Sequence, residues 1–228
     1  MPIYSPPTRE FLFLLYEIFE IDKLPIPGFK EYTKDFVKPL VEEAGKLASE
    51  VIAPTNESGD KNGCQLVNGI VETPKGFKEA FGLLRDSGWP SLNCSKEYGG
   101  QEIPLTVATP IGEIFGAANV ALYIYYVLSH GVYSTILAHG TEAQKKLYLS
   151  KLVTCQWTGT MNLTEPQCGT DLGLIRTKAT CDKDGTFKIT GQKIYISSGD
   201  HDLSENIIHL VLARISGAPM ECEVSHCL

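Results

Sequence analysis

The chain has 228 residues of ordinary composition, 43% hydrophobic and 21% charged, which suits one large domain or two small ones. Its 20 lysines and arginines against 27 aspartates and glutamates give a net charge of −7, which argues against a protein that coats nucleic acid. Seven scattered cysteines in a chain of this size indicate free thiols rather than a disulfide framework.

The N-terminal region contains an apolar run, Phe11–Tyr16, with Arg9, Glu10 and Glu17 close on either side. The run is too short to cross a bilayer, and it lacks the basic segment and cleavage site of a secretory signal. An arginine-rich, acid-poor transit peptide is not visible either. We therefore predict an intracellular protein with no membrane partner.

A helix is predicted between residues 32 and 51, because apolar side chains recur there every three to four positions. Pro39 should either kink this helix or mark its first turn. The expected buried face consists of Tyr32, Phe36, Leu40, Ala44, Leu47 and Val51.

More helices should follow, with one extended interruption around Asn68-Gly69. A helix is expected over 74–87, and two largely apolar helices over 105–138. Thr141 is placed to cap the next helix. The segment 88–104, which joins the helix expected over 74–87 to the helices expected over 105–138, is rich in turn residues. It is long enough to be a functional or packed loop.

After Cys155 the pattern changes to short β-branched or alternating runs separated by turn residues, which predicts strands. The sequence thus indicates a helical domain to about residue 155, followed by an antiparallel β-domain whose sheet ends on an unpaired edge. The predicted strands cover 157–163, 176–181, 187–190, 192–197 and 206–214.

Several kinds of site can be set aside. The glycine fingerprints of dinucleotide-binding and P-loop folds are absent from the sequence, as is the nucleophile elbow of hydrolases. His201 stands between two aspartates, but adjacent side chains in a loop rarely converge, so we expect a solvated turn. Cys222, His226 and Cys227 would need a fourth ligand to bind zinc. No metal site is predicted.

The first candidate stretch is residues 161–173, "MNLTEPQCGTDLG". Thr164 and Thr170 lie on either side of Glu165-Pro166, and Gly169 allows close approach of the backbone. Exposed N–H groups and hydroxyls in such a loop suit an anion such as a pyrophosphate.

The second stretch is residues 193–200, "KIYISSGD". As a strand it would present Tyr195 and Ser197 on one face. An aromatic plane beside a hydroxyl suits a flat heteroaromatic ligand. From the residues alone, a ligand site and a plain turn with a half-buried strand remain equally good interpretations.

Both stretches resemble the acyl-CoA dehydrogenase family. "LTEPQCGTD" (163–171) resembles its Thr-Glu-Pro-x-x-Gly-Ser/Thr-Asp signature, and "GQKIYISSGD" (191–200) resembles its Gly-x-Lys-x-aromatic-Ile-Ser/Thr segment. "GDHDLSENIIHLVLARISGAP" (199–219) is similar to the longer bacterial-type subgroup that includes 3-methylmercaptopropionyl-CoA dehydrogenase-like enzymes. The likeness covers nearly all of residues 30–219.

The resemblance implies an α+β fold in which an all-helical N-terminal domain precedes a partial antiparallel, β-barrel-like middle domain. The C-terminal helical bundle of the family has no counterpart in these residues. The implied domains are an N-terminal extension (1–34), the helical domain (35–155), the partial β-domain that binds flavin (156–219) and an atypical tail (220–228).

The resemblance also implies an FAD site. Leu163 and Thr164 would line the flavin ring, Thr170 would bond the pyrophosphate and Tyr195 would pack against the ring. Cys168 stands where the family pattern has a smaller residue. The cofactor-binding residues expected from the resemblance are Leu163, Thr164, Gly169, Thr170, Tyr195, Ile196 and Ser197.

The implied reaction is FAD-dependent α,β-dehydrogenation of an acyl-CoA thioester, with an electron-transfer flavoprotein as acceptor and a homo-oligomer as the working form. The family's catalytic glutamate belongs to the helical bundle without counterpart in this sequence, so no catalytic residue is assigned and the chain is expected to be truncated and inactive alone. The alternative is a non-catalytic binding or assembly module. The expected compartment is the cytoplasm, with the mitochondrial matrix as the alternative.

Overall fold

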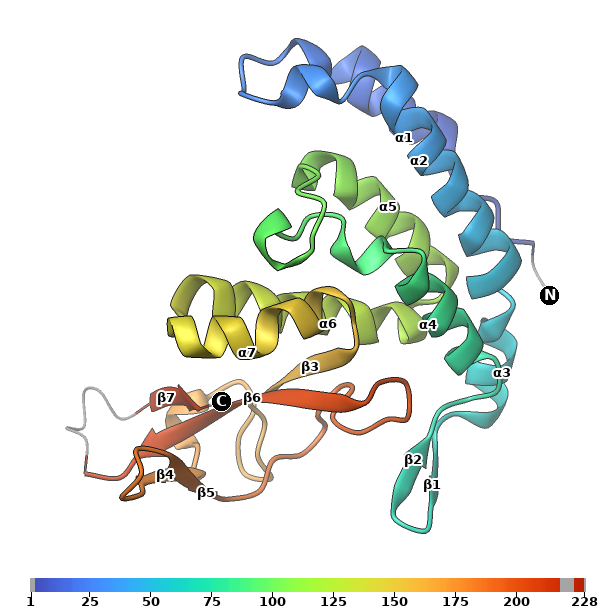
Figure 1. Cartoon of the computed structure of the whole chain (residues 1–228). Helices are drawn as coiled ribbons and strands as arrows, with labels where there is room; N and C mark the ends of the chain where they lie inside the picture. The colour runs from blue at the N-terminus through green and yellow to red at the C-terminus, as the bar shows by residue number, and fades with distance from the viewer. Residues whose placement is uncertain (1–2, 218–223, 228) are drawn as a thin grey trace. The chain divides into compact units, whose positions relative to one another are not determined.

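The computed structural model describes residues 3–217 and 224–227 (Figure 1). The chain divides into two compact units, Met1–Ile124 and Tyr125–Leu228, and the division falls inside helix α6 (Val120–His139). Helices come first and a sheet follows, which confirms the predicted α+β class. The predicted domain bounds stay a prediction; α7 and most of α6 lie in the same unit as the sheet.

The first unit is helical apart from one two-stranded ribbon. Its helices are α1 (Thr8–Phe13), α2 (Lys34–Leu47), α3 (Thr55–Asn62), α4 (Phe77–Asp86) and α5 (Leu105–Ala118). Single π-helical turns continue α1 and α2, at Leu14–Ile18 and Ala48–Ile52. Short 3₁₀ turns occupy Ile21–Lys23, Phe29–Glu31, Trp89–Ser91 and Lys96–Tyr98.

Helix α2 and the π-helical turn after it bury a face that shares only Ala44 with the predicted one. Val37, Val41, Ala44 and Ala48 are fully buried, whereas Phe36 is 50% exposed. The sequence carries two apolar stripes with equally good helical spacing, so periodicity alone could not show which one packs. Pro39 lies inside the helix, beyond its first turn.

The second apolar stripe of α2 lines a surface groove of about 520 Å³. Its apolar lining includes Phe36, Leu40, Leu47, Val51, Trp89 and Leu92. Glu43, Lys46 and Glu50 also line this groove. We refer to this surface as the α2 groove.

The predicted extended interruption is confirmed as the hairpin of β1 (Gln65–Val67) and β2 (Ile70–Glu72). Asn68 and Gly69 both have positive φ, 51° and 82°, as a two-residue hairpin turn of this kind requires. The break between α5 and α6 is also as predicted. Asn119 makes it, because its side-chain oxygen accepts from the N–H of Leu122 at 3.1 Å.

The second unit contains α6 from Tyr125 onward, α7 (Glu142–Val153) and a mixed sheet. Thr141 caps α7 as predicted: its hydroxyl accepts from the N–H of Gln144, whose side chain reaches back to the N–H of Thr141. The strands are β3 (Trp157–Asn162), β4 (Lys178–Cys181), β5 (Phe187–Thr190), β6 (Asn206–Ile215) and β7 (Val224–Cys227).

The sheet has the order β3-β6-β4-β5, and β7 also pairs with β6. β3 and β4 run parallel to β6, whereas β5 and β7 pair antiparallel with β4 and β6. The prediction of a wholly antiparallel sheet is therefore wrong. Parallel pairing needs a long crossover, and residues 163–205 supply one between β3 and β6. Of the predicted tail, β7 is described, and residues 220–223 and 228 lie outside the described residues.

Helix α6 has the length and mean hydropathy, 20 residues and 1.3, of a membrane-crossing helix. Such a match is weak evidence, because the core helix of a folded domain passes the same test. Within the second unit α6 packs on β3: the N–H of Gly159 donates to the hydroxyl of Ser129 at 3.0 Å. One face of α6 is thus packed against the sheet.

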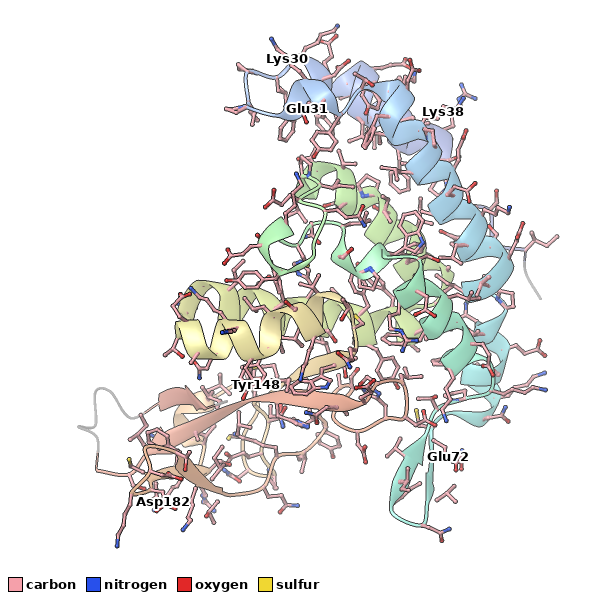
Figure 2. The ribbon with its side chains drawn as sticks, in the orientation of Figure 1. Lys30, Glu31, Lys38, Glu72, Tyr148 and Asp182 are labelled. Carbon is pink, nitrogen blue, oxygen red and sulfur yellow. The ribbon has the colours of Figure 1, made fainter. Side chains whose placement is uncertain are left out.

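The face of β3 that meets α6 leaves no room for a side chain at Gly159. A Cβ there would lie 2.7 Å from Cβ and Cγ2 of Val132. Nearby, the ammonium of Lys151 lies 3.6 Å from the ring centre of Trp157. Tyr148 of α7, labelled in Figure 2, has its ring 6.3 Å from the same Trp157 ring. Because there is no room for a Cβ at Gly159, this glycine sets how closely α6 and β3 can approach.

We expect Gly159→Ala to lower the free energy of unfolding by about 1–3 kcal/mol, because the new methyl group overpacks against Val132. Gly131→Ala, in the same helix as Val132, is the control: its Cβ would meet nothing within 4 Å, and alanine favours the helix. Urea unfolding of the two variants measures both values. Equal effects would contradict close packing at Gly159.

Candidate functional site

The carboxylate of Glu165 is buried in the second unit and accepts four hydrogen bonds. The residue is 3% exposed. One oxygen accepts from the N–H of Arg176 at 2.7 Å and from the amide of Gln167 at 2.6 Å. The other accepts from the N–H of Thr177 at 3.0 Å and from the ammonium of Lys193 at 2.9 Å. All four donors converge on one buried anion.

Lys193 ties the second candidate stretch to the first. Its ammonium donates to the carbonyl of Leu163 at 3.0 Å as well as to Glu165, and the side chain is nearly buried. Beside it, the N–H of Ile194 donates to the carbonyl of Thr164 at 3.0 Å. Lys193 and Leu163 are 30 residues apart in sequence, and these contacts bring the two stretches together.

The turn that follows Glu165 closes on itself. The N–H of Glu165 donates to the carbonyl of Cys168 at 2.8 Å, and the N–H of Cys168 donates back at 3.1 Å. Pro166 and Gln167 form the tip of this small loop. The signature sequence therefore folds as a tight hairpin whose first residue is the buried anion.

Glu165 is held as a carboxylate. Burial alone would raise its pKa, but hydrogen bonds from Thr177, Lys193 and Arg176 outweigh it and hold the pKa of this carboxyl well below its ordinary value. At neutral pH the group has no proton to give, and its lone pairs are already used by donors. The geometry gives it a structural task rather than an acid–base one.

The predicted strand over 192–197 is wrong: this segment is a loop. Tyr195 and Ser198 have φ values of 56° and 55°, in the left-handed region that a strand excludes. The N–H of Ile194 is bonded to Thr164 of the other loop instead of to a neighbouring strand. Tyr195 is 89% exposed, so a bulky aromatic residue stands in a strained backbone conformation on the surface.

All seven residues expected at a cofactor site lie in the two joined loops. Leu163, Thr164 and Ile196 are half-buried, whereas Gly169, Thr170, Tyr195 and Ser197 are exposed. A Cβ on Gly169 would lie 3.6 Å from the Thr164 methyl group, an ordinary contact, so the chain's own packing does not require glycine there. We call these two loops, 163–171 and 193–200, the paired loops.

Residues on β3 that the sequence interpretation did not single out also hold the paired loops. The hydroxyl of Thr160 donates to the carbonyl of Ser197 at 2.7 Å. The hydroxyl of Thr158 lies 3.0 Å from Nε2 of His201. The alternation of polar residues along "WTGTMN" was a usable signal, because every second side chain of a strand shares one face.

The prediction that His201 lies in a solvated turn is wrong, because the residue is only 7% exposed. Its ring packs edge-on against Tyr125 with 4.9 Å between ring centres. Burial lowers the pKa of its imidazole, with Asp200 and Asp202 opposing that shift. Among residues 3–217, whose side chains the structure describes, no three metal-ligating side chains gather. Cys222 lies outside the described residues.

Comparison with known proteins shows the protein family to which the chain belongs. The sequence profile of the acyl-CoA dehydrogenase N-terminal domain matches residues 37–156, more than half of the chain. The chain therefore belongs to the acyl-CoA dehydrogenase family, a family of oxidoreductases.

Particular relatives narrow the position within the family. The chain is 40% identical over 217 residues to 3-methylmercaptopropionyl-CoA dehydrogenase of Ruegeria pomeroyi, covering 95% of this chain and 37% of that protein. Butyryl-CoA dehydrogenase from Megasphaera elsdenii is a similar solved structure, with 26% identity and a TM-score of 0.63, over 79% of this chain and 44% of that one.

A third likeness supports the fold alone. An acyl-CoA dehydrogenase from Bacillus anthracis, solved in complex with FAD, has 23% identity and a TM-score of 0.67, over 90% of this chain and 32% of that one. The chain thus spans less than half the length of these relatives.

The depressed pKa of Glu165 predicts a pH-dependent stability. Its folded pKa lies below the unfolded value of about 4.3, so the stabilisation is full above that value and is lost as pH falls toward the folded pKa. Glu165→Gln removes this titration. We expect the free energy of unfolding of the wild-type chain to fall more steeply than that of the variant between about pH 5 and pH 3.

The measurement is urea unfolding at several pH values, with Asp182→Asn as control. Asp182 is a half-buried carboxylate whose pKa is also lowered, first by Lys188 and then by the N–H of Lys183. Its replacement should leave most of the acid-side slope in place. Parallel slopes for wild type and Glu165→Gln would contradict the charged state assigned to Glu165.

Proposed function

We propose that the paired loops hold the flavin ring of FAD and that this chain is the flavin-contacting part of an acyl-CoA dehydrogenase. The observation that carries the proposal is the Lys193–Glu165 ion pair, which brings the residues of both signatures together. Family membership supports the choice of ligand.

The residues present fit such a ligand. A flat heteroaromatic ring needs an aromatic or apolar surface and a few hydrogen-bonding groups at its edge. The paired loops offer the exposed ring of Tyr195 and the half-buried side chains of Leu163 and Ile196. Thr170 and Ser197 are exposed residues whose hydroxyls can serve phosphate or ring-edge atoms.

In this proposal each residue keeps one task. Leu163, Thr164 and Ile196 line the ring, and Tyr195 packs against it. Gly169 lets the pyrophosphate approach the backbone, and Thr170 donates its hydroxyl to it. Ser197 offers its hydroxyl near the reactive edge of the ring. When bound, FAD supplies the acceptor for the hydride of the substrate.

Glu165 does not supply the base. It is buried, its oxygens accept four hydrogen bonds, and its pKa is held low, so it cannot remove an α-proton at neutral pH. We propose that these 228 residues alone dehydrogenate no acyl-CoA and that the base comes from sequence outside them. The proposed substrate is an acyl-CoA thioester, as in the names of the relatives.

The proposed partners and location follow the family reaction. An electron-transfer flavoprotein would take the electrons, and the chain would work in a homo-oligomer. The proposed compartment is the cytoplasm, with the mitochondrial matrix as the alternative.

A second candidate function is a non-catalytic binding or assembly module. The α2 groove favours it, since an apolar surface groove is suited to a partner. The exposed apolar side chains of the β1–β2 hairpin, Leu66 and Ile70, favour it too.

Titration of the chain with FAD, followed by flavin fluorescence and visible absorbance, tests the proposal. We expect saturable binding, and we expect Tyr195→Ala to weaken it about three- to tenfold through loss of ring packing. Phe187→Ala is the matched control, an exposed aromatic residue on β5 of the same unit. It should bind as wild type does.

Colourless protein that does not take up FAD would contradict the flavin proposal and favour the module. Equal effects of the two substitutions would contradict the role assigned to Tyr195.

A further inference from the structure

The polar face of β3 lies against the second of the paired loops. Thr158 and Thr160 are both fully buried, and they share one face because strand side chains alternate. Buried threonines without partners would destabilise the strand, so where their hydroxyls go has to be explained. Both go to residues 197–204.

Thr160 fixes the middle of that loop. Its hydroxyl donates to the carbonyl of Ser197 at 2.7 Å, a short bond from a side chain with no exposed surface. Ser197 lies between the two left-handed residues, Tyr195 and Ser198. This bond from a buried side chain therefore holds the peptide at the centre of the strained turn.

Thr158 holds the far end of the loop through His201, and the hydrogen bonds determine where the ring carries its proton. The N–H of Leu203 donates to Nδ1 of His201 at 3.1 Å, so Nδ1 accepts and has no hydrogen. The ring is then neutral with its proton on Nε2, which lies 3.0 Å from the Thr158 hydroxyl.

The rest of the chain of bonds follows. The Ser204 hydroxyl has its one hydrogen on the carbonyl of Asn206, so the Thr158 hydroxyl is the donor in the 2.9 Å contact between Thr158 and Ser204. Ser204 in turn donates to the carbonyl of Asn206 at 3.0 Å, at the start of β6. Each donor in this series has one acceptor, which allows a single arrangement of the loop end.

The loop from Lys193 to Ser204 is thus held at three points: by Glu165 at its start, by Thr160 at its centre and by Thr158 at its end. Strained left-handed residues persist only where their surroundings over-determine them. The contacts at Lys193 and Ser197 lie on either side of Tyr195, and the contacts at Ser197 and His201 lie on either side of Ser198.

We propose that Thr160, together with the Thr158–His201 pair, positions the turn Tyr195–Ser198 for its ligand. These residues do not contact the ligand; they act through the loop. The inference rests on the proposed flavin function for the identity of the ligand, but the holding of the loop stands on the contacts of the chain alone.

The variants Thr160→Val and Thr160→Ser test the central contact. Valine keeps the shape and removes the donor, whereas serine keeps the donor. Amide hydrogen exchange over residues 194–203 should rise about tenfold in the valine variant and stay close to wild type in the serine variant. The affinity for FAD should fall in the valine variant and stay close to that of wild type in the serine variant. Thr180→Val, at an exposed threonine of β4, is the control and should alter neither.

Two results would overturn the inference: loop exchange in Thr160→Val equal to that of wild type, or a rise that Thr160→Ser does not reverse. If wild-type protein takes up no FAD, the flavin proposal fails, and the exchange data still decide whether Thr160 holds the loop.

The Thr158–His201 pair has its own readout. Imidazole ¹⁵N chemical shifts of His201 at neutral pH should show a neutral ring protonated at Nε2. Thr158→Val removes the acceptor of that proton, so it should change the Nε2 shift, whereas Nδ1 still accepts from the N–H of Leu203 and keeps its shift. A ring protonated at Nδ1, or charged, in the wild-type protein would contradict the arrangement.

Discussion

The buried ion pair of Glu165 and Lys193 is the contact on which the rest of the site depends. Taking two charges out of water is expensive, and their attraction offsets this only when other hydrogen bonds complete the geometry. In this chain Arg176, Thr177 and Gln167 complete it on the carboxylate, and the carbonyl of Leu163 completes it on the ammonium. Such a pair adds little net stability. We infer that it selects one arrangement of the two loops, because any other arrangement that separated the pair would leave a buried charge unpaired. Removing one partner would leave a buried charge unpaired.

The surface chemistry of the site follows from that constraint. With the pair formed, Ile194 bonds to Thr164, the next residue turns left-handed, and the ring of Tyr195 stands exposed beside the first loop. β3 supplies the second support, since one of its faces packs on α6 through Gly159 and the other bonds the loop through threonines. β3 therefore supports a strained and exposed loop. Binding sites are commonly formed by loops that a strand or helix holds in place.

Local signals in the sequence predicted much of the fold. The capping threonine before α7, the Asn-Gly hairpin and the two apolar helices after residue 105 were all found, because each is set by neighbouring residues. The errors fall where distant contacts decide. The strand expected over 192–197 is a loop because Lys193 and Ile194 bond to another loop. The parallel partners of β6 and the burial of His201 likewise come from residues remote in sequence. Five site residues were singled out from residue chemistry, and the family resemblance named their ligand: Thr164, Gly169, Thr170, Tyr195 and Ser197. Leu163 and Ile196 came from the resemblance alone. The supporting residues Thr158 and Thr160 were not predicted.

The most direct test of this account is the hydrogen-exchange rate of the Ile194 amide in Lys193→Met, compared with wild type and with Lys61→Met, which breaks the exposed Glu57–Lys61 pair. The account predicts exchange at least about tenfold faster in Lys193→Met, since the two loops lose the ion pair that joins them and Ile194 loses its bond to Thr164. Lys61→Met should leave the rate unchanged. Unchanged protection of Ile194 in Lys193→Met would show that the loops stay together without the pair, and would contradict the account.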